Sequence, residues 1–142
     1  MNIKRMDKRA ILPTYGTKYS AGADLYALLD EDLVIAPSET ILVHTGICME
    51  IPTGLVGLVF ARSGLATKKG LAPANKVGVI DNDYRGEIMV PLHNHTKEEK
   101  VIKHGERIAQ IIFMPYIMEQ FDEVDELSET VRGEGGFGST GR

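Results

Sequence analysis

The sequence predicts an all-β fold for this chain of 142 residues. Short apolar runs rich in Val and Ile recur along its whole length, and Gly and Pro separate them. The periodicity of an amphipathic helix is hard to find over any long window. Short strands at regular spacing are typical of a sandwich or a barrel, and the length fits one domain.

Five apolar segments have the composition of strands, namely residues 40–51, 54–60, 87–92, 100–103 and 107–115. A strand, a turn and a second strand are predicted over residues 75–87, because the central Asp-Asn-Asp sequence is typical of a turn. One short helix is expected to begin near Ser63, whose hydroxyl can cap the first turn, and to end at Gly70.

Residues 119–129 form an acidic segment with six carboxylates and no basic side chain. Phe121, Val124 and Leu127 are spaced by three, which allows one or two helical turns. The same apolar residues could line a strand or an extended arm packed on a partner. The residues alone leave these interpretations open.

Charge and hydropathy limit the partners of the protein. Its net charge is −4 at pH 7, which disfavours a nucleic-acid duplex because duplex binding needs a basic face. No apolar run approaches the length of a membrane span and no secretory signal is visible, so we expect no membrane partner and a cytoplasmic location. Cys48 is the single cysteine, and its neighbours Ile47 and Met49 suggest a buried thiol.

Polar residues stand out at three places along the chain. Asp24 lies among small apolar residues, where it either caps a turn or holds a water of a hydrated Mg²⁺. Arg62 and the Ser63 hydroxyl converge with free N–H groups at the start of the predicted helix, which forms an anion site unless the Arg is simply solvated. Gln110 interrupts an apolar strand, so it either faces solvent or lines a pocket.

Two carboxylates, Asp81 and Asp83, lie in the predicted turn of residues 75–87. They could merely shape the loop. However, Asn75, Tyr84 and Arg85 surround them and could bind a base, a sugar and a phosphate. One carboxylate would then activate water as a general base.

Residues 132–142 combine five glycines with two guanidiniums, two hydroxyls and one aromatic ring. Glycine lets backbone N–H groups turn toward an anion, Arg132 can hold a phosphate bidentately, and Ser139 and Thr140 add hydroxyl donors. Phe137 has no stabilising role in a glycine tail unless a flat group such as a nucleobase stacks on it. The alternative is a disordered tail.

Five segments, in this order and at these separations, resemble the five motifs of the homotrimeric dUTP pyrophosphatases (dUTPases). They read AGADLYA, ARSGLA, GVIDNDYRG, GERIAQ and RGEGGFGSTG. The resemblance implies a jelly-roll-like, distorted β-barrel subunit of the β-clip type with one short helix. It also implies a homotrimer with an exchanged C-terminal arm and active sites shared by all three chains. We therefore expect a single β-barrel domain with an extended arm over residues 1–131, and a flexible Gly-rich phosphate-binding tail over residues 132–142.

The resemblance further implies hydrolysis of dUTP to dUMP and pyrophosphate with Mg²⁺ as cofactor. This reaction keeps uracil out of DNA and supplies dUMP for dTMP synthesis. Asp81 would activate the attacking water, and Asp24 would contact Mg²⁺ through water. Phosphate oxygens would be held by cationic, hydroxyl and amide side chains, namely Arg62, Ser63, Gln110, Arg132, Ser139 and Thr140. Gly64 and Gly138 would also bind the substrate.

The same resemblance implies that the segment beginning at Asn75 selects the base and the sugar. Asn75 and the backbone around Gly78 and Ile80 would complement uracil and collide with a 5-methyl group. Tyr84 would pack on deoxyribose and leave no room for a 2′-hydroxyl, while Phe137 would close over the base. Such collisions matter because a pocket that merely fails to accommodate one small group discriminates by only about 10 to 200-fold.

Two other function classes remain to be separated by experiment. The dCTP deaminases share this fold and also use a pyrimidine triphosphate, but the DNDYRG turn and the Phe-bearing tail favour a dUTPase. A regulator could keep the fold and bind dUTP without turnover, and the presence of Asp81 argues against it.

Overall fold

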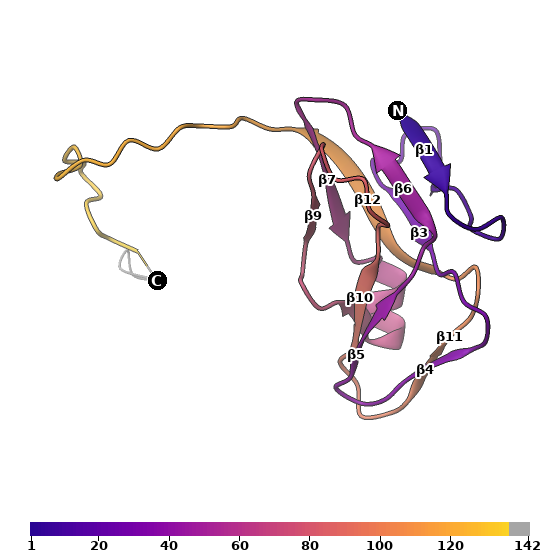
Figure 1. The fold of residues 1–142 in the computed structure, drawn as a ribbon. Coiled ribbons are helices and arrows are strands. Elements are labelled where there is room, and N and C mark those ends of the chain that lie inside the picture. Colours follow the sequence, from indigo (N-terminus) through magenta and orange to yellow (C-terminus); the bar gives the residue numbers. More distant parts are fainter. Residues whose placement is uncertain (137–142) are drawn as a thin grey trace.

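A computed structural model describes residues 1–136, which form an all-β fold with one short helix (Figure 1). The largest sheet has five strands in the order β2-β3-β12-β7-β9. Its central strand is β12 (Arg107–Pro115), which pairs antiparallel with β3 (Ala23–Tyr26) and with β7 (Leu55–Phe60). The two edges are β2 (Thr14–Tyr15) and β9 (Gly78–Ile80).

Three smaller antiparallel sheets complete the described fold. One has β10 (Val90–Asn94) between β5 (Thr40–Val43) and β8 (Leu71–Pro73). The other two pair β1 (Asn2–Arg5) with β6 (Ile47–Glu50) and β4 (Leu33–Ile35) with β11 (Lys100–Ile102).

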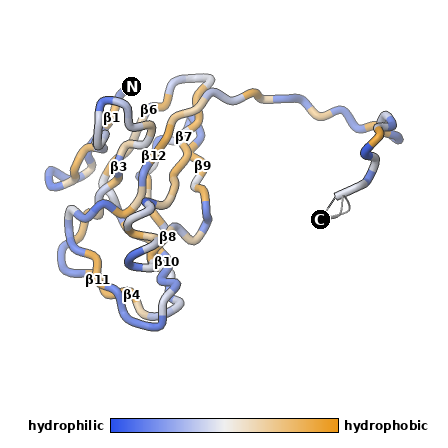
Figure 2. Tube along the Cα trace, turned by 180° about the vertical axis from the view of Figure 1, so that it is seen from behind, coloured by the Kyte–Doolittle hydropathy of each residue, from blue (hydrophilic) through white to orange (hydrophobic). Residues whose placement is uncertain are grey.

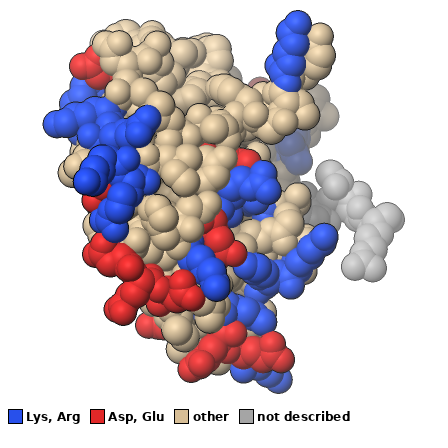
Figure 3. All heavy atoms as spheres, turned by 90° about the vertical axis from the view of Figure 1, so that its right-hand side faces the viewer, with Lys and Arg blue, Asp and Glu red and all other residues tan. Residues whose placement is uncertain are grey.

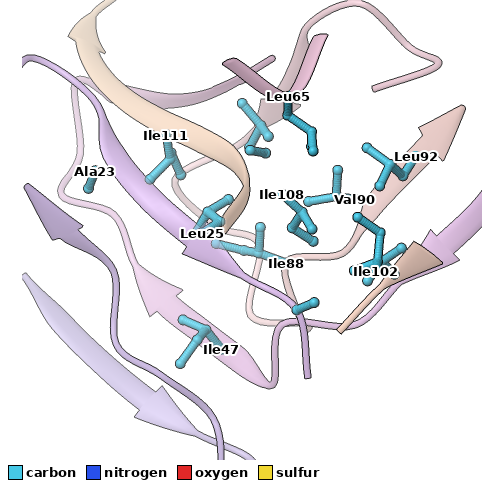
Figure 4. Packing of buried hydrophobic residues seen from close by; sticks show 14 of the residues in the cluster. Ala23, Leu25, Ile47, Leu65, Ile88, Val90, Leu92, Ile102, Ile108 and Ile111 are labelled. Atoms are coloured by element: carbon cyan, nitrogen blue, oxygen red, sulfur yellow. The ribbon is translucent and has the colours of Figure 1, made fainter. Parts of the chain in front are cut away.

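The sheets enclose one apolar core. Leu25, Ile47, Leu92, Ile108 and Ile111 are fully buried there and come from β3, β6, β10 and β12 (Figure 4). Hydrophobic segments follow the strands, and hydrophilic ones lie mostly in the loops (Figure 2). Burial of each such side chain contributes about 1.5 to 3 kcal/mol, so tertiary packing stabilises strands too short to persist alone.

Most of the predicted strands are confirmed, and β12 has the predicted bounds. The predicted strand over residues 40–51 is instead two strands, β5 and β6. Gly46 separates them because its φ of +68° turns the chain in a conformation that favours glycine. Cys48 is only partly buried, contrary to the prediction, because strand alternation turns Ile47 and Met49 inward and Cys48 to the other face.

The strand pairing predicted over residues 75–87 is wrong. β9 forms as expected, but it pairs with β7, with Gly78 opposite Val59. No strand follows before β10, which pairs with β5 and β8 instead. The strands β1, β2, β3, β4 and β8 were not predicted, because each has only two to four residues. In addition, β1 and β3 carry charged residues and β8 ends at Pro73.

The predicted short helix is confirmed as η1 (Leu65–Lys69). Its N-cap residue is Gly64 and no side chain caps it, so the capping role expected for Ser63 is wrong. Gly70 ends the helix as predicted, with a φ of +66° and its N–H donating to the carbonyl of Ala66 at 3.1 Å.

We expect Gly70→Ala to lower the free energy of unfolding by more than Gly54→Ala. Both glycines have positive φ, which costs an Ala side chain about 1 to 2 kcal/mol. A Cβ at Gly70 would also lie 2.2 Å from Thr96 Cγ2, whereas a Cβ at Gly54 would meet nothing within 4 Å. Urea unfolding measures both changes, and an equal loss in the two variants would contradict the clash.

Residues 116–136 lie beyond β12 as an extended segment with no strand or helix, and they lead away from the sheets (Figure 1). This agrees with the extended arm and not with helical turns over residues 119–129. Phe121 and Leu127 are 97% and 87% exposed in the single chain. No helix in residues 1–136 is long and apolar enough to cross a membrane.

Candidate functional site

A polar pocket of about 390 Å³ lies beside β12. The predicted site residues that line it are Asp24, Arg62, Ser63, Gly64 and Gln110. The register of the sheet brings them together, because Gln110 lies opposite Asp24 on one side and Phe60, at the end of β7, on the other. Segments far apart in the sequence therefore converge on one strand.

Asp24 is the buried carboxylate of this pocket, with only 8% of the residue exposed. Arg62 Nε donates to Asp24 Oδ1 at 2.6 Å, and Arg107 Nη1 donates to Oδ2 at 3.3 Å. A buried carboxylate is tolerated when it is paired in this way. Two guanidiniums against one carboxylate leave a positive excess, which suits a phosphate group.

Arg107 is the site residue that the sequence analysis missed. Strict alternation would place Arg107 and Gln110, three residues apart, on opposite faces of a strand. The register of β12 against β3 shifts between Arg107 and Ala109, so both side chains line the same pocket. A bulge of this kind has no signal in a single sequence.

Gln110 lines the pocket, which was one of the two alternatives predicted for it. Its Nε2 donates to the carbonyl of Ala61 at 2.9 Å, which ties β12 to the segment before Arg62. A Cβ at Gly22 would lie 2.4 Å from Gln110 Oε1. A larger residue at position 22 would require the Gln110 side chain to shift.

The chemistry of the pocket fits a largely hydrated Mg²⁺ and not a caged metal. Asp24 is the carboxylate available, and both of its oxygens already accept bonds from arginine. Within residues 1–136 no group of three His, Cys, Asp or Glu side chains could hold a metal ion. Mg²⁺ keeps several waters and often binds through one carboxylate together with substrate phosphates.

A second pocket, of about 290 Å³, lies beside β9 and the loop after it. Asn75, Ile80, Asp81 and Tyr84 are among the residues that line it. β9 is an edge strand, so backbone groups on its outer edge have no strand partner among the described residues. Asp81 is exposed, which leaves its carboxylate open to water.

Tyr84 has a fixed place at this second pocket. Its hydroxyl donates to the carbonyl of Glu87 at 3.0 Å. A Cβ at Gly86 would lie 2.4 Å from the Tyr84 hydroxyl oxygen, so the ring lies directly against that glycine. Tyr84 is 41% exposed and available to a ligand.

The predicted site residues thus fall into separate places within one chain. The two pockets share no lining residue. Arg132 lies on the exposed arm, where its Nε donates to the carbonyl of Gly135 at 3.1 Å. The predicted residues Phe137, Gly138, Ser139 and Thr140 lie outside the described residues.

On one face of the molecule, positive and negative side chains are interleaved (Figure 3). Glu106 links η1 to the start of β12, because its carboxylate accepts bonds from Lys69 Nζ at 2.9 Å and from the Lys103 N–H at 3.0 Å. Burial works against the charged form, but these hydrogen bonds prevail and lower the pKa of Glu106 below its usual 4.5.

We expect Glu106→Gln to destabilise the protein at neutral pH and to matter less in acid. Because the pKa of Glu106 is lower in the folded state, its ionised form stabilises the fold. This contribution is fully present above pH 4.5 and is lost as the pH falls through the lowered pKa. Urea unfolding across this range, with Glu98→Gln as a control, measures the effect. Glu98 pairs with Lys100 but 81% of its side chain is exposed. A difference between Glu106→Gln and wild type that does not shrink in acid would contradict this expectation.

The sequence matches known proteins over almost its whole length. The dUTPase family model matches residues 8–141. A deoxyuridine 5'-triphosphate nucleotidohydrolase of Desulfitobacterium hafniense is 54% identical over 138 residues, covering 96% of this chain and 91% of that protein. Another, from Nautilia profundicola, is 47% identical over 142 residues, covering 100% of this chain and 99% of that protein.

A solved dUTPase structure has the same fold as this chain. The dUTPase of Staphylococcus bacteriophage 80alpha with dUPNHPP is 30% identical to this chain and has a TM-score of 0.89. The similarity covers 99% of this chain and 98% of that one. The family model, the sequence relatives and the fold agree, and this chain belongs to the dUTPase family.

Proposed function

We propose that this protein hydrolyses dUTP to dUMP and pyrophosphate in the cytoplasm, which keeps uracil out of DNA and supplies dUMP for dTMP synthesis. The observation that carries the proposal is its near-complete alignment, at about half identity, with nucleotidohydrolases named for dUTP. The two pockets support it, because one offers cations for phosphates and the other offers a carboxylate, an amide and an aromatic ring.

Asp81 is the general base of the proposed reaction. Its carboxylate takes a proton from a water molecule as the water oxygen bonds to the α-phosphorus. The bond from that phosphorus to the bridging oxygen of the β-phosphate breaks in line, and pyrophosphate leaves. Asp81 suits this role because it is exposed at the rim of the second pocket and faces solvent water.

The triphosphate lies, in this proposal, against the first pocket and the tail. Arg62, Ser63, Gly64 and Gln110 contact phosphate oxygens, and Arg107 adds positive charge beside them. Tail residues complete these contacts, namely Arg132, Gly138, Ser139 and Thr140. Asp24 would hold the water shell of a bound Mg²⁺, which would neutralise phosphate charge. Arg62 and Arg107 fix the orientation of the Asp24 carboxylate.

Uracil lies at the outer edge of β9 in this proposal. The backbone around Gly78 and Ile80, with Asn75, supplies the donors and acceptors for the base. The Tyr84 ring packs against deoxyribose where a 2′-hydroxyl would stand, and Phe137 closes over the base. The unpaired edge of β9 supports this assignment, since backbone groups there are free to bond.

We further propose a homotrimer in which each active site combines residues of three chains. The separation of the two pockets within one chain supports it, because one substrate needs both sets of residues. The arm supports it too, since Ile117, Met118, Phe121 and Leu127 are apolar and at least 84% exposed in the single chain. Packing on a neighbouring subunit would remove this surface from water.

Hydrolysis in water labelled with heavy oxygen tests the site of attack. Attack on the α-phosphorus places the label in dUMP, and the pyrophosphate remains unlabelled. Mass spectrometry of the two products distinguishes this from attack on the β-phosphorus, which would label pyrophosphate and contradict the proposed step.

A further inference from the structure

Glu87 stands out as a largely buried carboxylate at the end of the loop that carries Asp81 and Tyr84. Only 13% of its side chain is exposed. Its Oε1 accepts the backbone N–H of Thr45 at 3.1 Å and of Gly46 at 2.7 Å, and its Oε2 lies 2.8 Å from His44 Nδ1. Charge-assisted bonds of this kind are strong, so the carboxylate fixes the loop to the turn between β5 and β6.

The main chain of the next residue reinforces this attachment. The Ile88 N–H donates to the Ile47 carbonyl at 2.9 Å, and Thr45 Oγ1 donates to the Ile88 carbonyl at 2.5 Å. The turn that receives these bonds is itself tightly packed, because a Cβ at Gly46 would lie 2.8 Å from the Ala10 side chain. Glu87 is therefore bound to a rigid part of the core.

Tyr84 depends on this anchor for its position. Its hydroxyl bonds to the backbone carbonyl of Glu87, and its ring lies against Gly86. Both contacts belong to the residues immediately before the anchored Ile88. A shift of residue 87 would therefore carry the Tyr84 ring with it.

We propose that Glu87 is a positioning residue that sets the place of the Tyr84 ring and thereby the rejection of a 2′-hydroxyl. This rests on the proposed function, in which Tyr84 packs against deoxyribose. Glu87 also lines the second pocket, but both of its carboxylate oxygens are engaged by the β5–β6 turn, so it acts through Tyr84. When the carboxylate is lost, the segment before Ile88 relaxes outward and the pocket accepts ribose more readily. The phosphate pocket has no lining residue in this segment and stays as it is.

The test compares kcat/KM for dUTP and for UTP in the full-length wild type and in Glu87→Ala. Their ratio is the informative quantity, because a loss of folded enzyme lowers both values equally and a merely structural role leaves the ratio unchanged. We expect the ratio to fall by at least about tenfold in Glu87→Ala, the scale on which one small group is discriminated. The effect should lie mainly in KM, with the KM for UTP falling relative to the KM for dUTP.

Two further variants sharpen the result. Glu87→Gln keeps an oxygen that can accept the Thr45 and Gly46 N–H groups, so its ratio should stay within about threefold of wild type. Glu98→Ala removes a carboxylate of the same size whose side chain is 81% exposed, and it should leave the ratio unchanged. An unchanged ratio in Glu87→Ala, or an equal fall in Glu87→Gln, would overturn the inference.

Misfolding of the variant and failure of the proposed dUTP hydrolysis can each be distinguished from failure of this inference. If Glu87→Ala does not fold, Glu87→Asp replaces it, because the shorter Asp side chain cannot hold both N–H groups in place. A lowered ratio of kcat/KM for dUTP to that for UTP then supports the inference, and an unchanged ratio overturns it. A wild-type protein that fails to hydrolyse dUTP would overturn the proposed function and this inference together. Wild-type hydrolysis with an unchanged ratio in the variants overturns the inference alone.

Discussion

Replacement of Asp81 by Asn is expected to lower kcat for dUTP by at least about 10² to 10⁴, the usual scale for loss of a general base. Asn has nearly the same shape but cannot take the proton of the attacking water. The pocket is otherwise intact, so we expect the Kd of dUTP to change by less than about threefold. Single-turnover kinetics and calorimetric titration measure the two quantities separately.

Asp83→Asn is the matched control, because it lies two residues away in the same exposed loop. We expect it to retain most of the activity. Turnover that survives in Asp81→Asn and disappears in Asp83→Asn would reassign the base to Asp83. Survival in both would contradict a carboxylate base from this loop.

Deletion of residues 132–142 is expected to abolish most hydrolysis while leaving the protein folded. The proposed tail contacts supply one guanidinium, two hydroxyls and an aromatic ring to the bound nucleotide, and the loss of a single transition-state donor costs about 10² to 10³ in rate. None of the described residues of this segment belongs to the apolar core, and residues 132–134 are exposed. We therefore expect kcat/KM to fall by at least about 10² and the melting temperature to change by less than about 4 °C.

Deletion of Arg142 alone is the control for this truncation, because it leaves Arg132, Phe137, Ser139 and Thr140 in place. We expect it to behave as wild type. Unaltered kcat/KM in the full truncation would contradict a role for the tail in the reaction.

The same two variants test whether active sites are shared between subunits. Asp81→Asn carries an intact tail, and the truncated chain carries an intact Asp81. If each site takes these elements from different chains, mixed trimers formed by unfolding and refolding the two variants together should regain activity. If each chain supplies both elements to one site, no mixed assembly can contain an active site, and the mixture should stay inactive.

Local chemistry made part of the site predictable from the sequence. Gly70 ends the helix where a left-handed conformation was expected, and the strand of Gln110 has the predicted bounds. Asp24 and Gln110 were singled out as polar groups in apolar segments, and Arg62 as a cation at the start of the predicted helix; the structure places all three around one pocket. Polar residues that an apolar strand would normally avoid were therefore informative.

The unpredicted features are those that tertiary contacts decide. Arg107 reaches the pocket through a register shift, which strict alternation does not anticipate. β9 pairs with β7 and not with the strand that follows it, because the loop of Glu87 is attached to the β5–β6 turn instead. The role of Glu87 depends on donors at Thr45 and Gly46 that come close only in the folded chain.

The most direct test of the proposed function is to incubate the purified protein and Mg²⁺ separately with dUTP, dCTP, dTTP and UTP and to resolve the products by ion-exchange chromatography. We predict that dUTP alone is converted efficiently, to dUMP and pyrophosphate, which would establish the reaction, the base choice and the sugar choice together. Release of ammonia and dUTP from dCTP, or tight binding of dUTP with no product, would contradict this function.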